Sequence, residues 1–196
     1  GKKVYDWIIP EEWHISDGYI EDSEKNRIID FKENNLHVVS HSVPINKLIN
    51  LSQLKKKLFF LKRLPNAIPY KTSYYKKDWG FCLSYNDFKK LKDKKYNVVI
   101  KSEFKKGFMH YGELLIRGRS NKEILLKSYI CHPSMANNEL SGPSVLTFLT
   151  KYFLGLKSNY YTIRVVLLPE TIGTIAYINK NIIRLKKNFH TGMIVT

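Results

Sequence analysis

The sequence predicts a protein of the α/β class that contains two modules. From Gly112 onward, apolar runs typical of buried strands alternate with segments typical of helices, which is the pattern of an α/β layer. The preceding segment, from about Asp17 to His110, shows short strand patterns with only two short helix signals. We therefore expect a β-rich α+β module followed by an α/β layer.

The β-rich module begins with a predicted hairpin, in which residues 19–20 and 28–31 flank a polar turn at residues 22–26. Residues 36–43 alternate between polar and apolar side chains and predict a strand. On such a strand His37 and His41 would share one face. We favour ordinary histidines over a metal pair, because no third ligand is near in sequence.

Two helices and one further strand complete this module. Ser52 can cap a helix over residues 53–61, because serine is a favoured N-cap residue. Ser84 or Asn86 can cap a second helix over residues 87–92. The run 96–100 is rich in valine and predicts a strand that closes the module.

The α/β layer places polar residues at the ends of two predicted strands. Residues 124–130 form an apolar run that delivers His132, and a helix opens near Ser141 after a polar loop. Residues 163–168 form a second β-branched run that ends at Glu170. Sites in α/β proteins form where loops leave the carboxyl ends of parallel strands. A histidine and a glutamate placed in this way, His132 and Glu170, are the minimal set of residues for metal-assisted hydrolysis.

Composition is that of a soluble globular protein with one good core, since the chain has 196 residues and 43% hydrophobic content. The chain contains no run of about 18 apolar residues, so the sequence predicts no membrane-spanning helix. Two cysteines, Cys82 and Cys131, are too few for a disulfide scaffold and indicate a cytoplasmic protein. Strand alternation should point the Cys131 side chain away from His132, so we do not expect it to bind metal.

The net charge of +16 raises the question of nucleic-acid binding. Only six of the 33 basic residues are arginine, and the lysine clusters are scattered. Arginine is the residue suited to phosphate and base recognition. Abundant Lys, Asn and Ile also follow from an AT-rich genome. The sequence therefore argues against nucleic acid as the partner.

Several longer stretches together resemble one protein family. They are Asp6–Trp13, Asn35–Val39, Pro69–Tyr75, Trp79–Cys82, Tyr111–Leu114, Cys131–Pro143 and Pro169–Gly173. The chain resembles the aminopeptidase-like proteins with an inserted domain of unknown function, described beside bacterial polysaccharide-biosynthesis genes. That family is a divergent branch of the co-catalytic zinc exopeptidases.

The resemblance implies a fold and a domain organisation. It implies part of a zinc-exopeptidase-like, three-layer α/β/α domain made of residues 1–17 and 111–196. Residues 18–110 would be the inserted β-rich module. Because further ligands of such enzymes come from later strands, we expect residues 1–196 to be a fragment or a truncated product.

The resemblance also implies roles for individual residues. His132 matches a zinc ligand, and Glu170 matches the general base that deprotonates the attacking water. Asn138 and Thr171 fall where two-metal enzymes carry carboxylate ligands. Amide and hydroxyl oxygens bind zinc less well than carboxylates do, so we expect one ion, zinc or another divalent metal. Glu139 is a spare carboxylate that could replace a missing ligand.

The resemblance implies that the substrate is a peptide N-terminus or an amide on an amino sugar. The hydroxyl-rich loop that contains Tyr74 and Tyr75 either lines the substrate cleft or packs at a module interface. A catalytically inactive pseudo-peptidase, which binds carbohydrate or peptide or acts as a scaffold, is the alternative function. Assembly as a homo-oligomer stays open.

Overall fold

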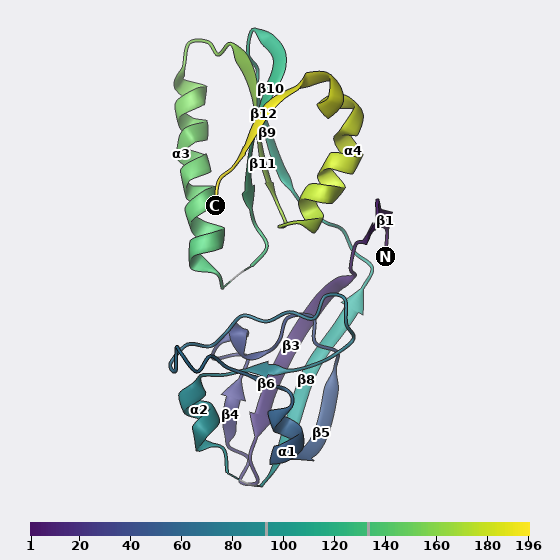
Figure 1. The fold of residues 1–196 in the computed structure, drawn as a ribbon, viewed down its shortest axis with the longest axis vertical. Helices are drawn as coiled ribbons and strands as arrows, with labels where there is room; N and C mark the ends of the chain where they lie inside the picture. Colours follow the sequence, from purple (N-terminus) through teal and green to yellow (C-terminus); the bar gives the residue numbers. More distant parts are fainter. Residues whose placement is uncertain (93, 133) are drawn as a thin grey trace. The chain divides into compact units, whose positions relative to one another are not determined.

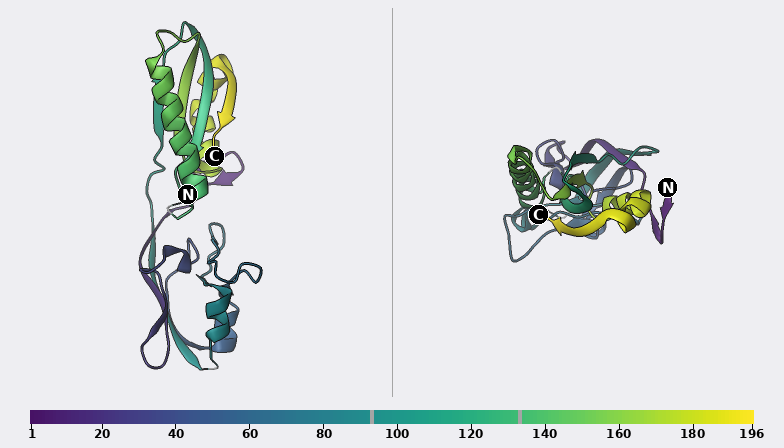
Figure 2. Two further views of the ribbon diagram at one scale, coloured as in Figure 1. Left: turned by 90° about the vertical axis from the view of Figure 1, so that its left-hand side faces the viewer. Right: turned by 90° about the horizontal axis from the view of Figure 1, so that it is seen from above.

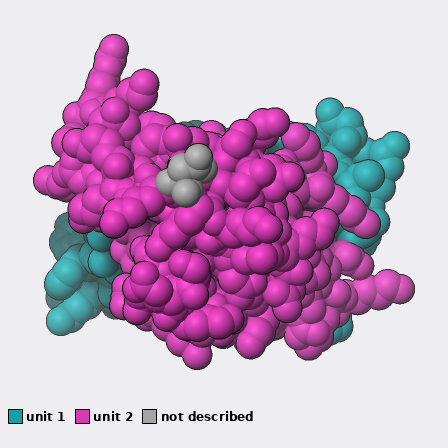
Figure 3. Space-filling model, turned by 90° about the horizontal axis from the view of Figure 1, so that it is seen from below, with its two compact units in different colours: residues 1–9, 108–196 teal, residues 10–107 magenta. Residues whose placement is uncertain are grey.

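The computed structural model describes residues 1–92, 94–132 and 134–196. The chain divides into two compact units, which Figure 3 shows in different colours. We call Gly1–Ile9 with Phe108–Thr196 the α/β unit, and Pro10–Gly107 the β-rich unit. The expected division placed residues 10–17 with the α/β part. In the structure they lie in the β-rich unit, because a continuous strand begins at Glu12 and runs through them.

The α/β unit is built on a four-stranded sheet in the order β12-β10-β11-β9. The central strands β10 and β11 are parallel, β12 is parallel to β10, and β9 is antiparallel to β11. The predicted strands at residues 124–130 and 163–168 are the central pair. The strand bounds are β9 (Gly112–Ile116), β10 (Ser120–Tyr129), β11 (Tyr161–Leu168) and β12 (Phe189–Ile194).

Two helices, α3 (Gly142–Gly155) and α4 (Ile172–Asn188), cover opposite faces of this sheet, as Figures 1 and 2 show. Leu146 of α3 packs in one core cluster with side chains such as Leu126. Tyr177 of α4 packs in another cluster, with side chains such as Val166. Because alternate residues of a strand point to opposite faces, the central strands β10 and β11 supply both cores. The unit is therefore a three-layer α/β/α arrangement.

A buried ion network ties α4 to the sheet. Arg164 on β11 donates to both carboxylate oxygens of Glu123, at 2.8 and 2.9 Å, and to Glu113 at 2.6 Å. Arg184 on α4 donates to the same Glu123. The side chain of Glu123 is only 5% exposed, and the hydrogen bond from Arg164 lowers its pKa below the usual range. Each charged group is thus paired where desolvation is most costly.

The β-rich unit has an antiparallel sheet in the order β4-β3-β8-β5. Its core includes Ile20, Phe81 and Tyr96. The predicted hairpin is confirmed, since Tyr19 pairs with Asp30 and Ile20 with Ile29. The main strands are β3 (Glu12–Glu21), β4 (Arg27–Asp30), β5 (Ile45–Asn50) and β8 (Lys95–Lys105). Short pairs are β1 (Lys3–Val4) with β2 (Trp7–Ile8) in the α/β unit, and β6 (Leu58–Phe59) with β7 (Phe81–Cys82).

Both predicted helices of the β-rich module exist, with shifted bounds. Helix α1 spans Leu51–Lys55, because its N-cap is Asn50, which forms a capping box with Gln53 and lies two residues before Ser52. It ends early because the chain leaves it to form β6. Helix α2 spans Tyr85–Lys90, and its N-cap is Ser84.

The predicted strand over residues 36–43 is wrong. A 3₁₀ turn occupies Asn35–His37, capped by the side chain of Asn34. Only isolated bridges follow, from Val38 and Ser40. The left-handed φ of 65° at His41 then turns the chain. His37 and His41 do not share a strand face.

Among the helices of the described residues, none is both long and apolar enough to cross a bilayer.

Candidate functional site

The carboxyl ends of β10 and β11 lie side by side and position the two residues that the sequence singled out. Tyr129 pairs with Leu168, and the Ile130 N–H donates to the Leu168 carbonyl at 3.2 Å. The chain continues from there to His132 and Glu170. Their side chains meet at the same sheet edge, with His132 Nδ1 4.0 Å from Glu170 Oε2. The structure brings this predicted pair together.

Glu139 is the closest ionisable partner of His132. Two backbone hydrogen bonds follow His132. The Met135 N–H donates to the His132 carbonyl, and the Glu139 N–H donates to the Met135 carbonyl. This turn returns the Glu139 carboxylate to His132 Nδ1, where the distance is 2.7 Å. Both side chains are almost buried, with exposed fractions of 10% for His132 and 9% for Glu139. Such a carboxylate fixes the ring and its tautomer.

The second oxygen of Glu139 also has a defined donor. The Cys131 N–H donates to Glu139 Oε2 at 2.7 Å, while Oε1 faces His132. Burial by itself would raise the pKa of Glu139, but these hydrogen bonds lower it below its usual value. Glu139 is therefore a carboxylate with the Cys131 N–H on one oxygen, while its other oxygen faces His132 Nδ1 and lies 3.5 Å from the Cys131 sulfur.

The prediction that Cys131 points away from His132 is wrong. Strand β10 ends at Tyr129, so strand alternation does not extend to these residues. The sulfur lies 3.3 Å from His132 Nδ1 and accepts a hydrogen bond from the Glu170 N–H at 3.2 Å. Candidate ligand atoms of Cys131, His132 and Glu139 lie within 4.8 Å of one another. Burial raises the pKa of the Cys131 thiol to about 11.

Asn138 and Thr171 lie on the two loops that follow these strands. Asn138 lies in a π-helical turn, Asn137–Ser141, directly before Glu139. Thr171 precedes α4 with a left-handed φ of 51°, which a β-branched residue adopts only under strain. Gly142 starts α3 so close to the strands that a Cβ there would lie 2.3 Å from Ser128 Oγ. Close packing thus holds this loop against the sheet edge.

Lys127 is a residue of this region that sequence reasoning missed. Its side chain lies on the face of β10 shared by Tyr129 and is almost buried, with 6% exposed. Burial lowers the pKa of Lys127, although the charge of Glu170 raises it. The available signal was a lone lysine within the apolar run 124–130.

Tyr74 and Tyr75 belong to the β-rich unit, where they form part of an exposed aromatic cluster. The ring of Tyr74 lies 4.1 Å from that of His41, edge to face, and His41 stacks on Trp13. Burial lowers the pKa of His41 to about 4, so this ring is neutral at neutral pH. A role of the two tyrosines in lining a substrate cleft stays a prediction.

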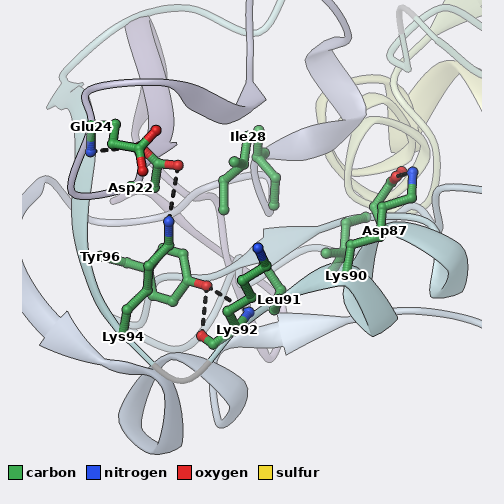
Figure 4. A pocket seen from close by; sticks show the side chains of 11 residues that line it. Asp22, Glu24, Ile28, Asp87, Lys90, Leu91, Lys92, Lys94 and Tyr96 are labelled. Atoms are coloured by element: carbon green, nitrogen blue, oxygen red, sulfur yellow. Dashed lines mark hydrogen bonds and ion pairs between the residues drawn. The ribbon is translucent and has the colours of Figure 1, made fainter.

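The β-rich unit also contains a pocket of about 330 Å³, shown in Figure 4. Lys94 donates to Asp22 at 3.0 Å, and Lys90 donates to Asp87 at 2.8 Å. These wall charges largely neutralise each other. None of the predicted site residues lines this pocket.

Comparisons with known proteins match the whole chain. Residues 12–103 match the family described as "Domain of unknown function (DUF2172)". Over all 196 residues the chain is 47% identical to a Clostridium acetobutylicum protein described as a "putative polysaccharide biosynthesis protein with aminopeptidase-like domain". A crystal structure of a "putative peptidase" from the same organism matches 99% of the chain, with a TM-score of 0.92 and 46% identity.

The chain spans less than half the length of these relatives, 45% of the first and 46% of the second. The high TM-score at this identity means that the chain shares the fold of that part of the crystal structure.

Proposed function

We propose that the α/β unit carries the active site of a metal-dependent aminopeptidase-like hydrolase, which cleaves a peptide bond or an amide on an amino sugar. The observation that supports it best is the meeting of His132 and Glu170 at the carboxyl ends of two adjacent parallel strands. We further propose that the unit is a divergent zinc exopeptidase domain, that the β-rich unit is its insertion, and that the protein is cytoplasmic.

The residues present suit a zinc ion, because imidazole and carboxylate groups are zinc ligands. His132 would hold the metal through Nε2, since its Nδ1 is engaged by Glu139. Asn138 would contribute its amide oxygen, and further ligands would come from the remainder of the natural protein. A bound divalent ion of this kind polarises the scissile carbonyl and lowers the pKa of a water molecule.

Glu170 is the general base of this proposal. Its side chain is 42% exposed at the sheet edge, so a water molecule and a substrate can reach it. It takes a proton from the attacking water and passes it to the leaving amine. The Cys131 sulfur holds the Glu170 backbone N–H and so helps to fix the start of this loop.

Glu170→Gln tests the assignment of the base in the longest natural reading frame that contains these residues. We expect hydrolysis of aminoacyl anilides to fall by about 10²–10⁴-fold, while the metal content is retained. Unchanged hydrolysis in Glu170→Gln would remove Glu170 from this role.

Catalytically inactive binding is the second candidate. It is favoured by the neutral side chains of Asn138 and Thr171, which stand where the resemblance predicts carboxylates. A pseudo-peptidase that binds peptide or carbohydrate would show binding with neither stoichiometric metal nor turnover.

A further inference from the structure

Lys127 is a lysine whose side chain is almost buried near the candidate site. Its side chain is 6% exposed on the central strand β10. Among the residues that the structure describes, its ammonium has no hydrogen-bond or ion-pair partner. The buried polar atoms without a partner do not include Lys127 Nζ, so this ammonium reaches solvent, and an anionic ligand can bind it there.

The ammonium of Lys127 points toward the candidate site. Residues 127 and 129 share one face of the strand, and Lys127 Nζ lies 4.3 Å from the centre of the Tyr129 ring. Tyr129 is the last residue of β10, so the side chain extends toward the end of the strand that carries His132. The charge of Glu170 acts on both Lys127 and Tyr129.

A buried polar atom without a partner belongs to the same layer. The hydroxyl of Thr174, in the first turn of α4, is buried and has no hydrogen-bond partner among the described residues. Thr174 lies three residues before Tyr177, which packs against the sheet, so both side chains lie on one side of the helix. Lys127 is on the sheet face that α4 covers, because it alternates with Leu126 on the α3 face.

A structural role does not explain Lys127. The buried arginines of this unit are fully paired, as Arg164 is by Glu123 and Glu113. We propose that the Lys127 ammonium is an anion-binding point of the site, which takes a ligand that bears a carboxylate or phosphate group. This inference rests on the proposed function only for the location of the site, and binding of the anion requires neither metal nor turnover.

The experiment uses the longest natural reading frame, labelled with ¹³C at the lysine side chains. Sodium acetate and sodium phosphate are titrated separately at constant ionic strength, with chloride as the balancing anion. The resonance of Lys127 is the one missing from the spectrum of Lys127→Met. Lys180→Met is the matched control, because Lys180 bonds the Tyr111 hydroxyl at the exposed surface of α4.

We expect a saturable shift of the Lys127 resonance with at least one of the two anions, retained in Lys180→Met. Which anion saturates at lower concentration distinguishes a carboxylate ligand from a phosphate ligand. In parallel, Lys127→Met should raise Tm, since it removes a partly desolvated charge that has no ion-pair partner. A non-saturable shift with both anions would overturn the proposal, and so would a lower Tm or a failure of Lys127→Met to fold. Because the metal content of the same samples is measured independently, failure of this inference is distinguishable from failure of the hydrolase proposal.

Discussion

The hydrogen bond between Glu139 and His132 gives the sharpest prediction about the proposed metal site. Glu139→Gln preserves the shape of the side chain but provides one acceptor oxygen instead of two. In the structure the two oxygens of Glu139 accept from different donors, the Cys131 N–H and His132 Nδ1, each at 2.7 Å. The amide nitrogen of glutamine must therefore face one of these donors, and that hydrogen bond is lost.

The magnitude follows from the kind of interaction that is removed. Both side chains are about nine-tenths buried, so solvent cannot replace the lost acceptor well. Loss of a carboxylate that orients a metal-binding histidine reduces metal affinity by about 10–100-fold, which is about 1.4–2.7 kcal/mol. We expect Glu139→Gln to weaken zinc binding by this factor.

Calorimetric titration of zinc into metal-free protein measures this effect, with Glu170→Gln as the matched control. Glu170 is 42% exposed and 4.0 Å from His132 Nδ1, so its substitution should change zinc affinity little. Equal zinc affinity in wild type and Glu139→Gln would refute the orienting role of Glu139. A larger loss in Glu170→Gln would assign Glu170 as a ligand instead of the base.

Three further predictions concern stability and ligation. Arg164→Met should lower the free energy of unfolding by about 3 kcal/mol in urea, against about 0.5 kcal/mol for the exposed Arg119→Met. This difference in unfolding free energy should shrink as the pH falls below about 4.5. Arg164 lowers the pKa of Glu123 in the folded protein, so the stabilisation from this ion pair is lost when Glu123 becomes protonated. Thr171→Gly should raise stability by about 1 kcal/mol in the same assay, because glycine relieves the left-handed φ of 51°, and a destabilised variant would contradict this. Cys131→Ser should leave zinc bound, and X-ray absorption of the wild type should lack a zinc–sulfur distance of about 2.3 Å; the presence of that distance would make Cys131 a ligand.

The α/β layer was predictable because its strands are buried on both faces. Residues 124–130 and 163–168 read as continuous apolar runs, and each is followed by a polar residue and a helix signal. The right-handed parallel connection then leaves few ways to arrange the two strands. The juxtaposition of His132 and Glu170 follows from that topology.

The errors in the β-rich module have local causes. Residues 36–43 alternate as a strand does, but the side chain of Asn34 caps a 3₁₀ turn there, and a local hydrogen bond of this kind competes with strand pairing. The first helix was placed late because Asn50 and Gln53 form a capping box that outweighs the lone serine at position 52.

The site contacts of Cys131, Glu139 and Lys127 depend on tertiary geometry. Strand alternation predicts the wrong face for the Cys131 sulfur, because the strand ends at Tyr129. Glu139 reaches His132 only through the turn at residues 132–139, which no periodicity encodes. The burial of Lys127 requires α4 to cover its face of the sheet, a contact between segments about 50 residues apart.

The central claim, that His132 holds a catalytic metal, is tested most directly by metal content. Elemental analysis of the longest natural reading frame, purified without chelator, should find about one zinc ion per chain. His132→Ala should lose this metal, while Glu170→Gln should retain it. No stoichiometric metal in the wild type, or equal metal in His132→Ala, would contradict the account and favour a binding protein without catalysis.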